Sequence, residues 1–219
     1  SGARDHAIIK SLNKSKKEKE IYCLASNNNP GISDICKKMK IIDINDAQLI
    51  KDYSMRQSID ITIIGPEDPL AFGVADSLWE AGIGVVGPKR NLAQIETSKS
   101  FTRNLLKEYK IPGCPKFKTF TNMKGAEDFL SLLGENYVVK YDGLAGGKGV
   151  KVAGDHLHSH EEALSYCKEL IKSGGHFVIE RKLIGEEFSL MSFSDGENLV
   201  HMPAAVSYTH LRAHETDHD

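Results

Sequence analysis

The segment with the clearest chemical signal is a glycine-rich stretch between two apolar runs, from Val138 to Val150. It begins near Lys140, contains Gly143, Gly146, Gly147 and Gly149, and carries a second lysine, Lys148. Ammonium groups and backbone N–H donors bind phosphate oxygens, and glycine lets the backbone approach them closely. The spacing is neither that of a Walker A loop nor that of a dinucleotide fingerprint. The alternative, a flexible hairpin, leaves both lysines unexplained.

A second candidate lies about forty residues further on, where the sequence VIERKLIGEE runs from Val178 to Glu187. An adenine ring needs a donor and an acceptor at its edge and apolar walls, which backbone groups at a strand end and Leu183 could provide. Glu187 could accept hydrogen bonds from ribose hydroxyls. Alone, this pattern is weak and more typical of a strand followed by a charged turn. Its value is its position after the glycine-rich stretch.

The elements before these segments indicate a doubly wound α/β domain. Short Ile- and Val-rich runs read as buried parallel strands, and stretches with helical spacing separate them. The expected strands are 21–25, 41–44, 59–64 and 83–86, and the expected helices are 45–57 and 68–81, the latter stopped by Gly82. The segment from Ser1 to Ala7 resembles a βα turn that enters a helix, with no strand before it. We therefore expect an interior strand position to be missing and backbone to be unpaired beside it.

The chain from residue 98 onward follows a different, α+β pattern. We expect a helix over 98–109 that Ile111-Pro112 ends, and a helix over 160–172 with Ser159 and Glu162 in capping-box spacing. The expected strands are 116–120, 137–141, 149–153, 177–180, 188–193 and 198–201, with Asp195-Gly196 as a hairpin turn.

Composition narrows the classes of function. The 219 residues are 40% hydrophobic and 26% charged, with a net charge of −2 and no apolar run long enough to span a membrane. Charges of both signs are mixed along the chain, which predicts neither a nucleic-acid nor a membrane partner but a small molecule. Cys23, Cys36, Cys114 and Cys167 lack CxxC spacing and predict reduced thiols in a cytoplasmic protein.

Taken in order, these motifs resemble one family. Lys140 to Val150 followed by VIERKLIGEE is similar to the nucleotide site of the ATP-grasp superfamily. GARDHA at 2–7, GPEDPLAFGVAD at 65–76 and GPKRNLAQIETSKSFTRNLLKEYKIP at 87–112 resemble segments of the phosphoribosylamine-glycine ligase family of purine biosynthesis. The resemblance implies a carbon–nitrogen ligase that uses ATP, with Mg²⁺ or Mn²⁺, to join glycine to 5-phosphoribosylamine. Glycyl phosphate is the implied intermediate, and ADP and phosphate leave.

The same resemblance implies roles for particular residues. Lys99 and Lys140 would meet the ATP phosphates, and the loop from Gly143 to Gly149 would fold over them. Glu180, Arg181 and Leu183 would address the adenine, the last two through backbone groups, and Glu187 the ribose. Gly65, Pro66 and Glu67 would lie near the phosphoribosylamine. No side chain is assigned to covalent catalysis.

The implied domains are residues 1–97 as a substrate-side domain, 98–117 and 188–205 as the start of the ATP-grasp core, and 118–187 as its lid. Asp5 and Gly146 are mild departures from the family pattern. The tail 206–219 has no family residues, and we interpret it as foreign to the native protein. The metal carboxylates of the family would follow, so the ATP-grasp region is expected to be incomplete. His210, His214 and His218 have zinc-helix spacing, but terminal disorder is the expectation.

Three hypotheses follow from the sequence. The first is part of a phosphoribosylamine-glycine ligase that does not turn over by itself and has marginal stability. The second is another ATP-grasp ligase or carboxylase, which the segments at 2–7 and 65–76 disfavour. The third is a nucleotide-binding module without catalysis. His156, His158 and His160 alternate like ligands, but we expect exposed turn histidines there.

Overall fold

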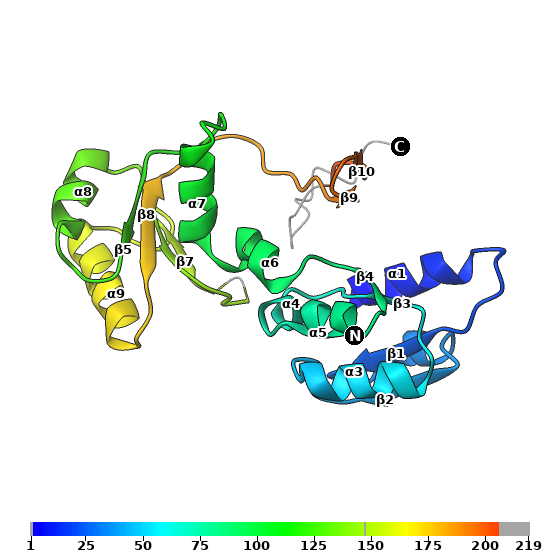
Figure 1. The fold of residues 1–219 in the computed structure, drawn as a ribbon. Helices are drawn as coiled ribbons and strands as arrows, with labels where there is room; N and C mark the ends of the chain where they lie inside the picture. The colour runs from blue at the N-terminus through cyan, green and yellow to red at the C-terminus, as the bar shows by residue number, and fades with distance from the viewer. Residues whose placement is uncertain (1, 147, 206–219) are drawn as a thin grey trace. The chain divides into compact units, whose positions relative to one another are not determined.

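A computed structural model describes residues 2–146 and 148–205 of the chain. It divides into two compact units, residues 1–181 and 182–219, which are described separately. The first unit begins with elements in which helices and strands alternate (Figure 1). They are α1 (Ala3–Asn13), β1 (Tyr22–Ala25), α2 (Pro30–Ser33), β2 (Lys38–Ile41), α3 (Ala47–Arg56), β3 (Ile61–Ile63), α4 (Asp68–Ala71), α5 (Val74–Glu80), β4 (Gly84–Val86) and α6 (Arg90–Thr97).

The strands of this region form two parallel pairs, β1 with β2 and β3 with β4, which confirms the α/β class expected for it. Ile50 of α3 packs with Val74 and Leu78 of α5 and with Ile83 in a small apolar core. Local signals fix the helices: the Asp46 side chain accepts a hydrogen bond from the N–H of Leu49 and starts α3. Gly82, with φ of +77°, follows the end of α5 as a left-handed C-terminal stop.

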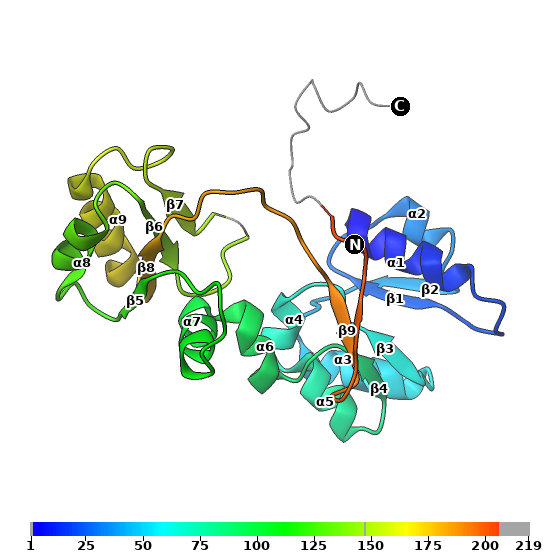
Figure 2. The same ribbon diagram turned by 90° about the horizontal axis from the view of Figure 1, so that it is seen from above.

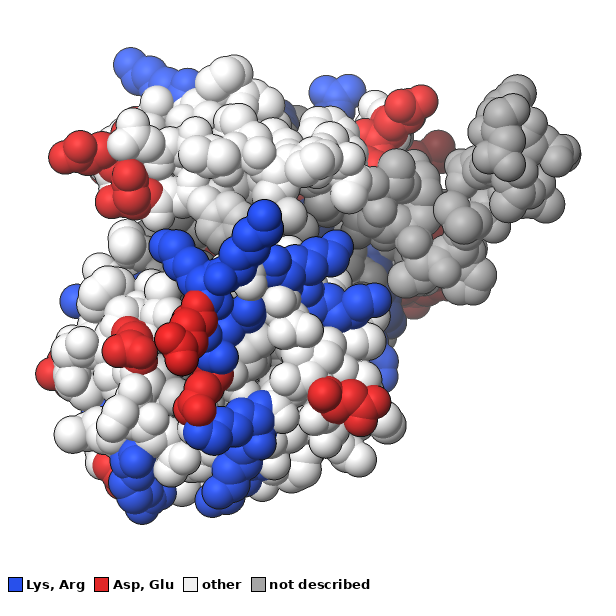
Figure 3. Space-filling model, turned by 90° about the vertical axis from the view of Figure 1, so that its right-hand side faces the viewer, with Lys and Arg blue, Asp and Glu red and all other residues white. Residues whose placement is uncertain are grey.

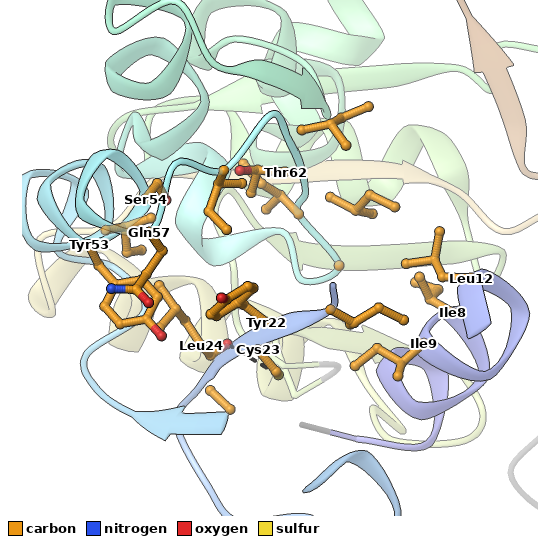
Figure 4. A pocket seen from close by; sticks show the side chains of 18 of the residues that line it. Ile8, Ile9, Leu12, Tyr22, Cys23, Leu24, Tyr53, Ser54, Gln57 and Thr62 are labelled. Carbon is orange, nitrogen blue, oxygen red and sulfur yellow. Dashed lines mark hydrogen bonds between the residues drawn. The ribbon is translucent and has the colours of Figure 1, made fainter. Parts of the chain in front are cut away.

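A cavity of about 560 Å³ separates the two strand pairs (Figure 4). Its walls are Ile8, Ile9 and Leu12 of α1, residues of β1 and β3, and the end of α3. Among the described residues, no strand pairs with the second edge of β1 or of β3. The hydroxyls of Tyr53 and Thr62 are buried there and have no hydrogen-bond partner in the part of the chain that is described. The expectation that an interior strand is missing at this position stays a prediction.

The rest of the first unit is built on one antiparallel sheet of four strands. Its elements are α7 (Lys99–Glu108), β5 (Phe117–Phe120), α8 (Ala126–Leu133), β6 (Tyr137–Tyr141), β7 (Val150–Val152), α9 (His160–Lys172) and β8 (Phe177–Arg181), and the strand order is β5-β8-β6-β7. Helices α8 and α9 lie on one face of this sheet, and α7 lies on the other (Figures 1 and 2). The sheet with its helices matches the α+β pattern expected from the sequence.

Several expected boundaries are wrong by a few residues. The strand expected at 41–44 is β2 at Lys38–Ile41, whose side chains are mostly exposed, so an apolar run is a poor guide to it. The helix expected over 68–81 is broken into α4 and α5 at Gly73, which has a left-handed φ of +79°. The strand expected at 188–193 is shorter and later, and helices α6 and α8 were not expected at all.

The described part of the second unit, residues 182–205, forms an antiparallel hairpin of β9 (Ser192–Ser194) and β10 (Leu199–His201). Its turn is the expected Asp195-Gly196, where an Asp195 oxygen accepts hydrogen bonds from the N–H groups of Glu197 and Asn198.

Charges of both signs lie on the molecular surface. Figure 3 shows a face on which basic side chains gather across the middle and acidic side chains lie beside them. None of the helices in the described part of the chain combines the length and apolar character that crossing a bilayer requires.

Candidate nucleotide-binding site

The alternation of β6 and β8 separates an apolar face of the sheet from a charged one. Val139, Phe177 and Ile179 are fully buried in the core with α8 and α9. The residues that follow Val139 and Ile179, namely Lys140 and Glu180, point to the opposite face, because successive side chains of a strand alternate. In the register of the sheet, Lys140 lies opposite Val178 and Glu180 lies opposite Val138. Lys140 contacts Glu180, and Glu180 contacts Arg103 of α7, so both charges lie on the side of α7.

Glu180 is the centre of a buried charge cluster. Only 4% of Glu180 is exposed, and its carboxylate accepts hydrogen bonds from Arg103 of α7 at 2.6 Å for Nε and 3.1 Å for Nη2. Lys140 forms an ion pair with the same carboxylate. Burial alone would raise the pKa of Glu180, but the two cations outweigh burial and hold the pKa below its ordinary value. Glu180 therefore stays ionised and fixes the position of both cations.

The glycine-rich turn is closed by backbone hydrogen bonds at its base. The N–H of Tyr141 donates to the carbonyl of Gly149 at 2.7 Å, and the N–H of Lys148 donates to the carbonyl of Ala145 at 2.9 Å. This confirms that the stretch joins two antiparallel strands, β6 and β7. Gly146, at the exposed turn, has a left-handed φ of +53° and no neighbouring atom where a Cβ would lie.

The Tyr141 ring holds the start of the turn between glycines. A Cβ on Gly143 would lie 2.6 Å from one edge of the ring, and a Cβ on Gly175, beyond α9, would lie 2.6 Å from the other edge. A Cβ on Gly149 would come within 3.0 Å of the Tyr141 Cβ. The glycines in this region are therefore needed for close packing around one aromatic ring as well as for turning.

Replacing Gly175 by alanine is expected to destabilise the first unit by about 1–3 kcal/mol, since the new methyl group overpacks the site. It would meet both the Tyr141 ring and the Leu170 carbonyl, at 2.6 and 3.1 Å. Gly185→Ala is the matched control, because no atom lies within 4 Å of its added Cβ. Thermal melts of both variants measure the effect, and equal melting temperatures would contradict it.

Lys99 and Asp142 connect this turn to the first turn of α7. Lys99 Nζ donates to the Gly143 carbonyl at 2.9 Å, while the Asp142 carboxylate accepts hydrogen bonds from Ser98 and Ser100. Burial lowers the pKa of Lys99, and the nearby Asp142 opposes that shift.

The structure brings some of the predicted site residues together. Lys99 contacts the loop at Gly143, Lys140 pairs with Glu180, and Gly149 closes the base of the same loop. Lys148 and Gly146 are exposed on the loop, and Gly147 lies outside the described residues.

The residues predicted to contact the adenine and the ribose are not gathered in the way the phosphate-binding residues are. The N–H of Arg181 donates to the Lys116 carbonyl at 2.9 Å, so strand pairing already uses that donor. Leu183 and Glu187 belong to the second unit, where both are exposed, and their place in the site stays a prediction.

The predicted substrate segments meet at the carboxyl ends of the first strands, the usual ligand edge of such sheets. A Cβ on Gly65 would lie 2.2 Å from an Asp5 oxygen, and one on Gly31 would lie 2.6 Å from the His6 ring. Pro66 follows Gly65 along the cavity wall, and Glu67 precedes the first turn of α4. The segments 2–7 and 65–76 are thus neighbours, although the sequence places them about sixty residues apart.

No metal centre is evident in the portion of the chain that is described, where no three His, Cys, Asp or Glu side chains form a cluster. His156 accepts from the N–H of Val152, and His160 pairs with the Gly134 carbonyl, so these alternating histidines have separate local roles. His210, His214 and His218 lie outside the described residues.

Strand β6 carries Lys140 and strand β8 carries Glu180, and both side chains face α7. A glycine-rich turn follows β6, and an α/β region precedes the sheet. This arrangement defines an ATP-grasp protein. Family models agree with this class: the phosphoribosylglycinamide synthetase N domain matches residues 1–96, and the ATP-grasp (A) domain of the same family matches residues 97–219. The chain belongs to the phosphoribosylglycinamide synthetase family.

Relatives support this assignment. The chain is 45% identical over 216 residues to the phosphoribosylamine-glycine ligase of Methanosarcina barkeri, covering 99% of this chain and 49% of that protein. It is 42% identical to the corresponding ligase of Methanopyrus kandleri, with the same coverage. The chain therefore spans about half the length of these relatives.

Solved structures show the same fold. The phosphoribosylamine-glycine ligase of Thermotoga maritima superposes with a TM-score of 0.73 at 25% identity, over 93% of this chain and 48% of that one. N5-carboxyaminoimidazole synthetase of Staphylococcus aureus, with bound ADP, has a TM-score of 0.67 at 12% identity, over 93% of this chain and 51% of that one. At that low identity the second likeness concerns the fold alone.

Proposed function

We propose that this chain forms the ATP-binding part of an enzyme that ligates glycine to 5-phosphoribosylamine. The observation that carries the proposal is the convergence of Lys99, Lys140 and the glycine-rich loop in a chain whose relatives are named phosphoribosylamine-glycine ligase. In the proposed reaction, a glycine carboxylate oxygen attacks the γ-phosphorus of ATP and ADP leaves. The phosphoribosylamine nitrogen then attacks the resulting acyl phosphate, forming the amide and releasing phosphate.

Each site residue receives a proposed role. Lys99, Lys140 and Lys148 neutralise phosphate oxygens, and the backbone of Gly143 to Gly149, Gly147 included, covers them. Glu180 holds Lys140 in place and lies beside the adenine, whose edge Arg181 and Leu183 address through backbone groups. Glu187 accepts from the ribose. Gly65, Pro66 and Glu67 face the phosphoribosylamine.

These residues fit a triphosphate, because fixed cations and a glycine backbone are the groups that such a ligand needs. They do not by themselves fit Mg²⁺ or Mn²⁺, since the described residues include no carboxylate cluster. A divalent ion is a proposed cofactor of the reaction, and no step of the reaction is assigned to it. A cytoplasmic location and an absence of nucleic-acid and membrane partners are part of the same proposal.

Calorimetry of this chain with ATP in magnesium buffer tests the nucleotide site, and GTP is the comparison. We expect saturable ATP binding and at least about tenfold weaker GTP binding, because adenine-edge contacts discriminate between the two bases. An absence of ATP binding would contradict the proposal.

The substrate side is tested by adding ribose 5-phosphate or bicarbonate to the chain with ATP present. A heat of binding with ribose 5-phosphate, but none with bicarbonate, supports the ligase. Binding of bicarbonate and not of the sugar phosphate would favour the second proposal, a carboxylase, since a biotin carboxylase domain is among the solved structures with this fold.

A further inference from the structure

Asp142 is a charged residue at the site for which neither the sequence motifs nor the proposed reaction supplies a role. It is the first residue after β6, and half-buried. One of its oxygens accepts hydrogen bonds at 3.1 Å from the Ser98 hydroxyl and from the Ser100 N–H, and the other accepts from the Ser100 hydroxyl. These partners are 42 and 44 residues away in the sequence, so the contact joins two distant segments.

The surroundings make this contact strong. Hydrogen bonds to an ionised carboxylate are roughly twice as strong as neutral ones. The Ser98 hydroxyl is also the cap of α7, because it accepts from the N–H of Phe101 at 3.1 Å. A negative charge beside the first turn of a helix interacts favourably with the helix dipole.

Two further hydrogen bonds, one at Asp142 and one at the next residue, fix the end of the loop at which Asp142 lies. Its own N–H donates to the His176 carbonyl at 2.9 Å, which ties it to the segment before β8. The next residue, Gly143, accepts the hydrogen bond from Lys99 Nζ at 2.9 Å. Thus Lys99 and the loop are held at a defined separation, while Gly146 and Lys148 at the far side of the loop stay exposed.

We propose that Asp142 is a positioning residue, which anchors the glycine-rich loop to the first turn of α7 and so places the loop and Lys99 for ATP phosphates. This inference rests on the proposed nucleotide site. Asp142 need not touch ATP: it acts by restricting where the loop begins. The affinity for a triphosphate is then higher because less loop motion is lost on binding.

Asp142→Asn tests the inference, since it keeps the shape of the side chain and removes the charge. In the ligand-free chain we expect the hydrogen-bonded amides at the base of the loop, those of Tyr141, Asp142 and Lys148, to exchange about tenfold faster, because a charge-assisted anchor is weakened. In magnesium buffer we expect the dissociation constant for ATP to rise about tenfold or more. Asp128→Asn is the matched control: it removes an exposed carboxylate from the first turn of α8 and should change neither quantity.

Ser100→Ala is the second variant, which removes one donor and leaves the backbone N–H in place. It should shift both quantities in the same direction by a smaller factor, and the double variant should add little to Asp142→Asn, because both changes remove one contact. If Asp142→Asn does not fold, the Ser100→Ala shifts decide.

The outcomes separate this inference from the proposed function. Unchanged loop exchange in Asp142→Asn would overturn the anchor. Faster exchange with unchanged ATP affinity would overturn the positioning role and leave a purely structural one. A failure of the unmodified chain to bind ATP would refute the proposed nucleotide site and the role toward ATP together, whereas the exchange data would still decide whether the anchor exists.

Discussion

Lys140→Ala is expected to weaken ATP binding by about 10- to 100-fold, the effect of losing a charged contact worth about 1.5–3 kcal/mol. The ammonium group of Lys140 is held by Glu180 on the charged face of the sheet, at the end of the strand that leads into the glycine-rich loop. A lysine fixed in this way is already in place when a phosphate arrives, so its removal is not compensated by a neighbouring flexible lysine. Calorimetry with ATP in magnesium buffer measures the change.

Lys118→Ala is the matched control for this experiment. Lys118 lies on β5 of the same sheet, is exposed, and places its ammonium over the Phe120 ring at 5.2 Å. Its removal changes the net charge equally but should leave ATP affinity within about twofold, because surface charges are screened. Equal losses in the two variants would point to net charge and not to a site at Lys140. Unchanged binding in Lys140→Ala would exclude that lysine from the phosphate site.

The sequence predicted elements well where local signals agree. The bounds of α9 were expected at 160–172, and its N-cap is Ser159, whose hydroxyl accepts from the N–H of Glu162. Strand β6 was expected at 137–141 because its residues are apolar and lead directly into glycine-rich sequence. Helix α8 was missed although Gly125 and Gly134 bracket it and acidic residues fill its first turn, a signal that a helix search could have used.

The contacts that organise the site could not be predicted from spacing. Arg103 is 77 residues from Glu180, and nothing in a helix with a charged face distinguishes an arginine that contacts a buried carboxylate from an exposed one. Asp142 lies inside the glycine-rich motif, but its serine partners belong to another segment of the chain. Both pairs depend on the packing of α7 against the sheet, which is a tertiary property.

Arg103→Met is expected to lower the free energy of unfolding of the first unit by about 3 kcal/mol or more at neutral pH. The loss arises because Glu180 keeps its charge in a site where 6% of its side chain is exposed, while it loses two of its hydrogen bonds. Urea unfolding measures the change. Arg103→Lys keeps the positive charge without the two-pronged geometry and should lose less. Arg181→Met removes an exposed arginine at the end of β8 and should have little effect.

The pH dependence distinguishes this charge interaction from lost packing. Because the pKa of Glu180 is lowered in the folded chain, its contribution to stability is present above the pKa of the unfolded state and is lost as pH falls through the folded pKa. The stability difference between the unmodified chain and Arg103→Met should therefore be largest at neutral pH and should shrink as the pH falls, because Glu180 takes up a proton first in the variant, which lacks one of the two cations, and only at lower pH in the unmodified chain. A difference that stays constant from neutral to acidic pH would mean that Arg103 stabilises the unit through its aliphatic stem.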